Sequence, residues 1–265
     1  DNNSEPDDFD YLRNNLQVQE NITLHRSPIN KGFGGGHMES LPYVHAKYFL
    51  CLNNDSIFLN DCLTHLSQHL DCHPEVGLAT AQNFDEHGRF SPSFHHYKTF
   101  WKLLLGKKTL EKINPVKFPE RKKEYTQAIK ITSPNGAFLF FRASTFAEIG
   151  GFDTNLFLYS EEMDFAKKLE KTAFEAALVP QARFQHFQGK SSKASTAISR
   201  EAMLSELYVI KKHYSFFHYK AVQLYYILTL PFKPRKWFLF PVIIKGVSLK
   251  YSLKQKQYIR FLKDN

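Results

Sequence analysis

Two uninterrupted hydrophobic runs dominate the pattern along the chain. Residues 47–52 read Lys-Tyr-Phe-Leu-Cys-Leu, and residues 136–142 read Gly-Ala-Phe-Leu-Phe-Phe-Arg. A strand that is buried on both faces shows no polar alternation, so each run predicts a strand inside a layered α/β fold. The first run is typical of a parallel strand, and a shorter strand is expected at 22–25.

Helical spacing follows the second run. Residues 143–149 have helical character up to the stop at Gly150 and Gly151. A second helix is expected to open at Glu161, because apolar residues recur between 163 and 169 at helical spacing and charged residues fill the positions between them. A further helix is expected over 60–74.

The stretch 90–130 is less regular. Its aromatic and basic residues alternate with Pro115 and Pro119, which is typical of a variable insertion, and one short helix is expected near 101–112. A long loop in a compact domain is usually functional or mobile. Two interpretations stay open for it, contact with an acceptor substrate or a partly ordered surface loop.

The composition changes after residue 195. Residues 201–265 contain 12 Lys or Arg against 3 Asp or Glu, interleaved with aromatic residues such as Trp237 and Phe238. The longest uncharged run, 221–232, is far below the ~20 residues that span a bilayer. The pattern favours a basic helical extension that packs on the preceding domain and also lies on an anionic membrane surface.

The whole chain has a net charge of +9, with 43% hydrophobic and 15% aromatic residues and three cysteines. This composition indicates a folded domain. Three cysteines are too few for a disulfide framework and fit a reducing cytosol. The positive charge would attract nucleic acid, but no nucleic-acid-binding motif accompanies it, so we predict no nucleic acid partner.

Three acids, Glu161, Glu162 and Asp164, begin the expected helix, and His186 ends a later strand. Acids in a first helical turn stabilise the helix dipole by about 0.3–1 kcal/mol each, which is the simplest explanation for them. Carboxylates combined with a histidine also suit a metal-assisted transfer reaction. The rest of the chain favours the second interpretation.

A polar tripeptide, residues 53–55, ends the first hydrophobic run. Ligands of open α/β sheets bind beyond the carboxyl ends of strands, so Asp55 stands where a divalent cation would bridge it to a diphosphate. An ordinary turn explains the same residues. The glycine-rich stretch 30–36 supplies backbone that can approach a ligand closely, although it fits neither the dinucleotide fingerprint nor the P-loop.

The helix expected over 60–74 carries two cysteines and three histidines on one flank. A zinc site is one interpretation of such a cluster. Structural zinc sites usually draw their ligands from separate elements, and neutral histidines often lie on a solvated face, so we favour an ordinary helix surface. The residues are Cys62, His65, His69, Cys72 and His73.

Seven short motifs occur in order along residues 1 to about 192. They are Asp1-Asn2-Asn3-Ser4, Asn30-Lys31-Gly32-Phe33-Gly34-Gly35-Gly36, Leu52-Asn53-Asn54-Asp55, Gly136-Ala137 with Arg142, Gly150-Gly151-Phe152-Asp153, Tyr159-Ser160-Glu161-Glu162-Met163-Asp164, and His186 with Gly189 and Ser191. In this order they resemble the motifs of family 2 glycosyltransferases, most of all the bacterial rhamnosyltransferase-like branch that builds surface polysaccharides. The ordered set is far more specific than any one motif.

The resemblance implies an α/β fold of the GT-A type, the fold of nucleotide-diphospho-sugar transferases. Such a fold has a mixed, mostly parallel sheet flanked by helices. We expect this domain at 1–195 and the helical extension at 196–265. In the family a strand and a helix precede the position of Asp1, so we expect the sheet to lack them.

The resemblance also implies roles for individual residues. Asp55 matches the metal-binding acid of a DXD-type motif, and His186 matches a second contact to the metal or the diphosphate, with Mg²⁺ or Mn²⁺ as the expected ion. Glu162 matches the catalytic base, usually an aspartate, and Glu161 and Asp164 stay open as alternative bases. The residues expected to bind the donor are Asp1, Asn3, Asn30, Gly32, Asn53 and Asp55.

The implied function is inverting transfer of a sugar, with rhamnose as a candidate, from a nucleotide-diphosphate donor to a glycan or polyprenyl-linked acceptor in surface polysaccharide synthesis. The enzyme is expected in the cytoplasm, peripheral at the inner face of the cell membrane. One alternative is a non-catalytic glycosyltransferase remnant at the membrane surface that has lost donor binding. A nucleotidyltransferase is disfavoured, because no lysine- and arginine-rich phosphate loop precedes Asp55.

Overall fold

The computed structural model describes residues 1–17, 19–187 and 195–260, so Gly189 and Ser191 of the seventh motif lie outside it. The α-helices are α1 (Pro6–Asn15), α2 (Gly32–Ser40), α3 (Cys62–Cys72), α4 (Phe100–Leu105), α5 (Lys107–Ile113), α6 (Ala143–Ile149), α7 (Glu161–Leu169), α8 (Thr196–His213), α9 (Phe216–Thr229) and α10 (Phe240–Lys245). The strands are β1 (Tyr48–Leu52), β2 (Ser56–Phe58), β3 (Val76–Phe84), β4 (Phe90–Ser91), β5 (Phe94–His95), β6 (Ile129–Ile131), β7 (Ser133–Pro134), β8 (Phe138–Arg142) and β9 (Glu175–His186). Short 3-10 helices are η1 (Leu41–Tyr43), η2 (Leu230–Phe232), η3 (Pro234–Leu239), η4 (Leu249–Tyr251) and η5 (Leu253–Lys256).

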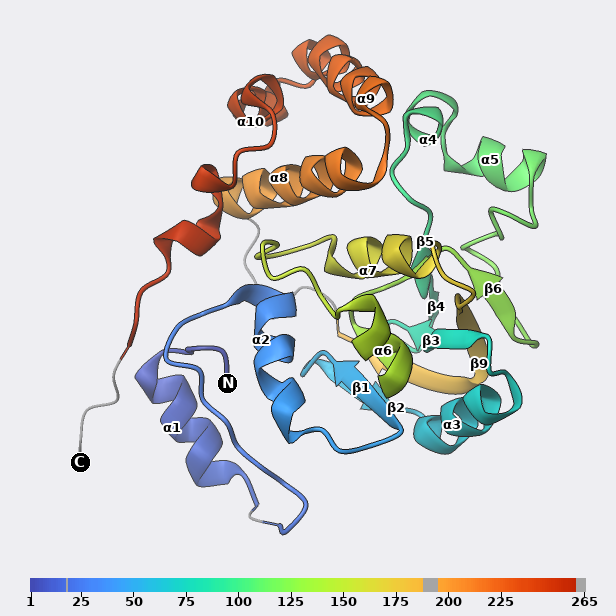
Figure 1. Cartoon of the computed structure of the whole chain (residues 1–265), viewed down its shortest axis with the longest axis vertical. Coiled ribbons are helices and arrows are strands. Elements are labelled where there is room, and N and C mark those ends of the chain that lie inside the picture. The colour runs from blue at the N-terminus through green and yellow to red at the C-terminus, as the bar shows by residue number, and fades with distance from the viewer. Residues whose placement is uncertain (18, 188–194, 261–265) are drawn as a thin grey trace.

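The main sheet is layered between helices (Figure 1). Strands β1, β8, β3, β9 and β2 follow one another across it, with β4 beside β3 and β6 beside β9. Helix α3 covers one face, and helices α6 and α7 cover the other. Strands β5 and β7 form a separate two-stranded ribbon.

The sheet is mixed, as expected, but it is not mostly parallel. Among the described strands, β3 and β9 form the one parallel pair, and the other pairs are antiparallel. Strand β1 runs antiparallel to β8, with Tyr48 opposite Arg142 and Leu52 opposite Phe138. The expectation of a parallel strand was wrong because burial on both faces removes polar alternation whatever the direction of the neighbouring strand.

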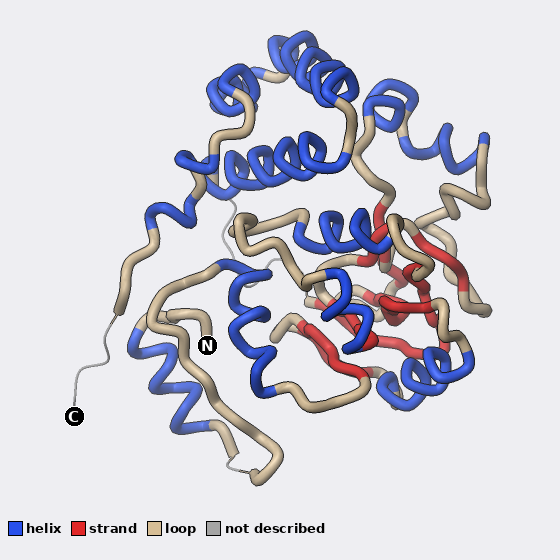
Figure 2. The backbone as a smooth tube through the Cα atoms, in the orientation of Figure 1, coloured by secondary structure: helices blue, strands red, loops and turns tan. Residues whose placement is uncertain are grey.

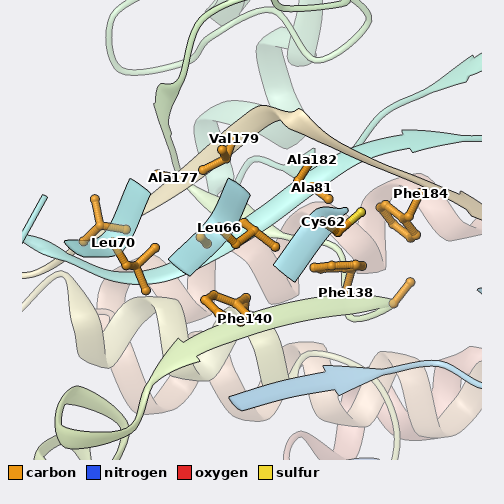
Figure 3. Close-up of a cluster of buried hydrophobic side chains, with 13 residues drawn as sticks. Cys62, Leu66, Leu70, Ala81, Phe138, Phe140, Ala177, Val179, Ala182 and Phe184 are labelled. Carbon is orange, nitrogen blue, oxygen red and sulfur yellow. The ribbon is translucent and has the colours of Figure 1, made fainter. Parts of the chain in front are cut away.

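One face of the sheet packs on α3 (Figure 3). Cys62, Leu66 and Leu70 recur every fourth residue of this helix, which places them on one stripe. Phe138 and Phe140 of β8 lie in the same buried cluster, together with alternate residues of the neighbouring strands. Asp61 caps the start of this helix, because its carboxylate accepts a hydrogen bond from the Thr64 N–H at 3.2 Å.

The opposite face packs on α6 and α7. Leu139 and Phe141 of β8 point to this side, so the alternate residues of one continuous hydrophobic run fill two separate clusters. The rings of Phe146 on α6 and Phe165 on α7 stack with centroids 5.2 Å apart. Phe141 meets both rings edge-on, so truncating it to alanine would cost about 3–5 kcal/mol.

The extension begins with α8, which packs on α7 (Figure 2). Val209 shares a buried cluster with Leu156 and Met163, and the Ser205 hydroxyl donates to the Leu158 carbonyl at 2.8 Å. Elsewhere on α8, residues such as Leu207 and Ile210 form a further cluster with α9, α10 and η3. No helix among the described residues combines the length and the apolarity that crossing a bilayer requires.

Most expected elements are confirmed, with two further corrections, and the glycine-rich stretch contains the start of helix α2, which no prediction covered. Residues 22–25 form no strand. The helix expected near 101–112 is interrupted at Gly106, whose φ of +79° ends α4 before α5 begins. Glycine adopts this left-handed conformation readily, which explains why the break falls there.

Candidate active site

The glycine-rich segment is held against the approach to α7. The Phe33 N–H donates to the Phe157 carbonyl at 3.0 Å, which brings the start of α2 next to residue 157. Gly32 has φ +76°, and a β-carbon there would lie 1.9 Å from the same carbonyl oxygen. Only glycine fits both the conformation and the space.

Asn2 fixes the turn that leads into α2. Its side-chain amide donates to the Gly32 carbonyl at 2.9 Å, and its side-chain oxygen accepts from the Lys31 N–H at 2.9 Å. The Asn30 side-chain oxygen accepts from the Gly32 N–H at 2.9 Å. Both side chains thereby satisfy backbone groups that a glycine-rich turn would otherwise leave unpaired.

A cavity of 290 Å³ opens beside this turn, and Asp1 and Gly32 are among its lining residues. His37 also lines it, and burial lowers the pKa of this imidazole, so the ring is neutral at pH 7. Asn30 lines a neighbouring cavity of 530 Å³. Asn3, which the resemblance assigns to the donor, lines neither cavity, because its side chain donates to the Tyr258 carbonyl at 3.1 Å.

The turn before α7 is strained. Tyr159 and Ser160 both have φ +69°, a left-handed conformation that costs a non-glycine residue roughly 1–3 kcal/mol. Strain of this size persists where the surrounding structure imposes it, often at functional sites. Here it sets the direction in which Glu161 and Glu162 leave the backbone.

Glu161 points into the protein. It is 1% exposed and packs against α2, where a β-carbon on Gly34 would lie 3.3 Å from its Cγ. Burial, with a smaller contribution from the charge of Glu162, raises the pKa of Glu161 to about 8. The side chain therefore holds a proton at neutral pH and joins α7 to α2.

Glu162, on α7, lies close to α2 and to the loop that contains Gly136. A β-carbon on Gly136 would lie 4.0 Å from Glu162 Oε2 and 3.9 Å from Phe33 Cζ, so the three residues are neighbours. Burial raises the pKa of Glu162, and the positive charge of Lys98 acts against that rise. The carboxylate is consequently more basic than an exposed one.

Asp164 is fully engaged with the extension. Its carboxylate lies 2.7 Å from His213 Nε2 and 2.8 Å from Lys212 Nζ, and Lys168 Nζ lies 3.8 Å away. Burial alone would raise the pKa of Asp164, but the hydrogen bonds from His213 and Lys212 lower it instead. Through these contacts, Asp164 connects α7 to α8.

Asp55 and His186 meet, as the positions of their strands predicted. The Phe187 N–H donates to the Asp55 carbonyl at 2.9 Å, and His186 pairs with Ser56 across β2 and β9. The ring atom His186 Nε2 lies 3.0 Å from Asp55 Oδ1 and 3.5 Å from Asn53 Nδ2. Asn53 is in turn tied to the loop of Gly136, because its N–H donates to the Ala137 carbonyl at 3.0 Å.

The pair of Asp55 and His186 fits a divalent cation as a partial site. Asp55 Oδ1 is buried, and beyond His186 Nε2 at 3.0 Å no donor among the described residues reaches it, so a cation would complete the surroundings of this carboxylate oxygen. Within the described ranges, no group of three or more His, Cys, Asp or Glu side chains is arranged around one metal position. A cation held here would take its other ligands from a bound substrate or water.

The cysteines and histidines of α3 occupy different environments. Cys62 is buried in the core, where its thiol donates to the Arg183 carbonyl at 3.0 Å, whereas Cys72 is exposed. The rings of His69 and His73 lie 4.3 Å apart between centroids, and burial lowers the pKa of His69. A zinc site on this helix finds no support in these contacts.

Sequence reasoning missed Lys98 and the part played by Asn2. Lys98 forms an ion pair with Glu206 of α8 and places its charge near Glu162. It lies in the irregular stretch 90–130, where no periodicity indicates which way a side chain points. Asn2 belongs to the first of the seven motifs, and this membership could have indicated that its side chain has a role in the site.

Comparison with known proteins identifies relatives of the chain. Residues 48–214 match the sequence model described as glycosyl transferase family group 2, which is more than half of the chain. A 75-residue stretch is 31% identical to the N-acetylglucosaminyl-diphospho-decaprenol L-rhamnosyltransferase of Mycobacterium tuberculosis, covering 28% of this chain and 24% of that protein. The chain thus spans about a quarter of the length of that relative.

Solved structures show the fold. GalNAc-T7, crystallised with UDP, GalNAc and Mn²⁺, superposes with a TM-score of 0.53 at 14% identity, over 94% of this chain and 46% of that one. A mannosyltransferase from Pyrobaculum calidifontis, in complex with GDP-Man and Mn²⁺, gives a TM-score of 0.49 at 12% identity, over 86% and 59%. The first of these likenesses shows that the chain has the GT-A fold.

Proposed function

Because the chain belongs to glycosyl transferase family group 2, we propose that it transfers a sugar from a nucleotide-diphosphate donor to an acceptor hydroxyl, with inversion at the anomeric carbon. The observation that carries this proposal is the position of Glu162. Its carboxylate lies at the start of α7, beside Gly136 and Phe33, and Phe33 lines the cavity next to the glycine-rich turn.

Glu162 is the base in this proposal. Its carboxylate takes the proton of the acceptor hydroxyl, the acceptor oxygen bonds to the anomeric carbon, and the bond from that carbon to the donor diphosphate breaks. Attack from the side opposite the diphosphate inverts the configuration. The raised pKa of Glu162 favours uptake of the proton, and the strained turn before α7 holds the carboxylate in place.

Asp55 and His186 would hold a divalent cation, Mg²⁺ or Mn²⁺. Such an ion neutralises the negative charge that develops on the departing diphosphate. The buried Oδ1 of Asp55, with His186 Nε2 3.0 Å away, supports this assignment, and Asn53 would orient the imidazole of His186. The GalNAc-T7 structure, which shares the fold, contains UDP together with Mn²⁺.

The donor nucleotide is proposed to bind at the cavity beside the glycine-rich turn. Asp1 and Gly32 line this cavity, and Asn30 shapes it by bonding to the Gly32 N–H. The Asp1 carboxylate lies 3.4 Å from the Arg26 guanidinium, so its position is fixed. Asn53 and Asp55 would contact the diphosphate end of the same donor.

We propose a glycan or polyprenyl-linked acceptor, with rhamnose as the candidate sugar, in the synthesis of a surface polysaccharide. The name of the mycobacterial relative, which refers to a diphospho-decaprenol and to L-rhamnose, supports this choice. The basic extension at 196–265 supports a peripheral location at the inner face of the cell membrane. Membership of the family by itself implies neither this acceptor and sugar nor this location.

Calorimetric titration with UDP, GDP and dTDP tests the proposal. One of the three is expected to bind in the presence of Mn²⁺, with at least tenfold weaker binding after EDTA and in the variant Asp55→Asn. Asp71→Asn, on the exposed end of α3, is the matched control and should bind as the unchanged protein does. Absence of binding by all three nucleotides would contradict the proposal and favour a remnant without donor binding.

A further inference from the structure

A cavity of 830 Å³ lies between the α4–α5 segment and the C-terminal part of α7, away from the glycine-rich turn. Its volume falls within the ~300–1,000 Å³ typical of sites for small ligands. We call it the α4–α7 groove. Six of its apolar lining residues are Trp101, Leu105, Ile113, Val116, Ala166 and Leu169.

The charges along the α4–α7 groove largely cancel. Lys130 lies 2.6 Å from Glu175, and Lys167 lies 2.6 Å from Glu170, so four of the charged lining residues form two ion pairs. Burial lowers the pKa of His218, which keeps this lining imidazole neutral at pH 7. A groove with paired charges and an apolar wall suits a hydrocarbon more than an anion.

The outer wall of the groove exposes apolar surface to solvent. Trp101 is 59% exposed and Val116 is 90% exposed. Lys102, the one charged residue of α4, turns inward and donates to the His96 carbonyl, so the outer face of this helix carries no charge. A helix with apolar residues on both its inner and outer sides is expected where the outer side meets an apolar partner.

The exposed side of α4 continues onto the extension. The Phe100 N–H donates to His218 of α9 at 3.3 Å, and Phe100 packs in the cluster that joins α8, α9 and α10. Helices α4 and α9 lie at the same end of the molecule (Figure 1). On α9, Phe217 and Leu228 are also mostly exposed, so the mouth of the groove adjoins a wider apolar surface.

Helix α7 connects the groove to the proposed base. Ala166 lies four residues after Glu162, which is one helical turn and about 6 Å along the axis. Tyr97 lines the groove, and the next residue, Lys98, places its charge near Glu162. A chain lying in the groove would therefore have one of its ends directed toward Glu162.

From these contacts we infer that the α4–α7 groove binds the hydrocarbon chain of a lipid-linked acceptor and so positions its sugar at Glu162. This inference rests on the proposed function, because it takes the acceptor to be lipid-linked. It assigns a role to the stretch 90–130, part of which forms the outer wall of the groove. The bilayer would be the source of the chain, and the exposed faces of α4 and α9 would face it.

Photolabelling of the full chain tests the inference. The probe is farnesol bearing a diazirine, a C15 isoprenoid alcohol without sugar or phosphate, and labelled residues are located by mass spectrometry. Label is expected on residues that line the groove, such as Trp101, Val116 and Leu169, and not on Leu104. The double variant Trp101→Ser with Val116→Ser should reduce this labelling at least fivefold, and both positions are exposed enough to leave folding intact.

The matched control is Leu104→Ser with Leu228→Ser. Both residues are exposed and apolar on α4 and α9, but neither lines the groove, so labelling should stay within twofold of the unchanged protein. Equal labelling of Leu104, Phe217 and the groove, or unchanged labelling of the double variant, would overturn the inference. Absence of label would overturn it as well.

Donor hydrolysis into water, measured on the same samples, separates the two proposals. Hydrolysis without groove labelling would overturn the groove and leave the transferase standing. With a prenyl-linked sugar as acceptor, the double variant should raise the acceptor KM at least fivefold with kcat nearly unchanged. Groove labelling with an unchanged acceptor KM would overturn the positioning of the acceptor.

Discussion

The imidazole of His213 donates a hydrogen bond to the carboxylate of Asp164 at 2.7 Å, and this contact joins the extension to the helix that carries Glu162. Lys212 adds an ion pair at 2.8 Å to the same carboxylate. The family match continues to residue 214, which takes in α8 and these two residues. Helix α8 therefore supports the proposed active site directly.

Replacing Asp164 by Asn should destabilise the fold by about 3 kcal/mol, because it removes the carboxylate from the buried imidazole of His213 and one of the two carboxylates that Lys212 contacts. The folded pKa of Asp164 lies below its ordinary value, so its stabilisation is present above pH 3.8 and is lost as the pH falls through the folded pKa. Urea unfolding at pH 7 measures the change. Asp71→Asn, which removes an exposed partner of Lys47, should leave the midpoint unchanged, and equal loss in both variants would contradict this account.

Glu162→Gln should lower transfer by about 10²–10⁴-fold, because the amide keeps the shape of the side chain but accepts no proton. Nucleotide affinity should stay within a few-fold. Glu148→Gln, on the exposed side of α6, is the control for a lost charge. Full turnover in Glu162→Gln, with loss in Glu161→Gln, would reassign the base to Glu161.

The activity should also depend on pH through Glu162. Its pKa is raised by burial, and a base acts in its deprotonated form, so kcat/KM should fall as the pH decreases through that raised value. A pH–rate profile locates the midpoint, which should lie above that of an ordinary glutamate. A profile that stays flat down to pH 4.5 would contradict Glu162 as the base.

Glu161→Gln should stabilise the protein at pH 8 by about 1–3 kcal/mol and much less at pH 5. The folded pKa of Glu161, about 8, exceeds its ordinary value of 4.5, so its favourable contribution is present below pH 4.5 and is lost as the pH rises through the folded pKa. Glutamine keeps the shape of the side chain and never ionises. Thermal melts of both proteins at the two pH values give the comparison, and an equal shift at both would rule this explanation out.

Gly32→Ala should destabilise the protein by considerably more than the roughly 1–2 kcal/mol of a left-handed conformation alone, because its β-carbon would also overlap the Phe157 carbonyl. Gly88 supplies the control. It has a similar φ of +73° with open space around the position of a β-carbon. Gly88→Ala should therefore show only the conformational cost, and equal losses of unfolding free energy at the two positions would remove the case for the close contact.

Four basic residues of the extension should hold the protein on anionic vesicles. Each cation near such a surface contributes about 1 kcal/mol, or roughly fivefold in affinity. Neutralising Lys233, Arg235, Lys236 and Lys245 to Gln should release most of the protein in a flotation assay. Equal flotation of the unchanged and neutralised chains would contradict an electrostatic contribution, and neutral vesicles provide the control.

The sequence predicted local elements well and their partners less well. Strand β8 and helices α3, α6 and α7 could each be predicted from the hydrophobic pattern of their own residues. The direction of β1 depends on β8, some 90 residues away, and no local pattern encodes it. The meeting of Asp55 and His186 could be foreseen because both stand at strand ends, whereas Asn3 turns to the carbonyl of Tyr258, a partner no nearby residue reveals.

Strand β9 is the last strand among the described residues, yet it pairs with β2, β3 and β6. Pairing between β3 and β9 links segments about 100 residues apart, and such long-range contacts are slow to form. During synthesis, β2, β3 and β6 emerge from the ribosome before their common partner exists. The strand edges that β9 will pair with stay open until residue 186 has been released, so the nascent chain should be prone to misassociation and should depend on chaperones up to that point.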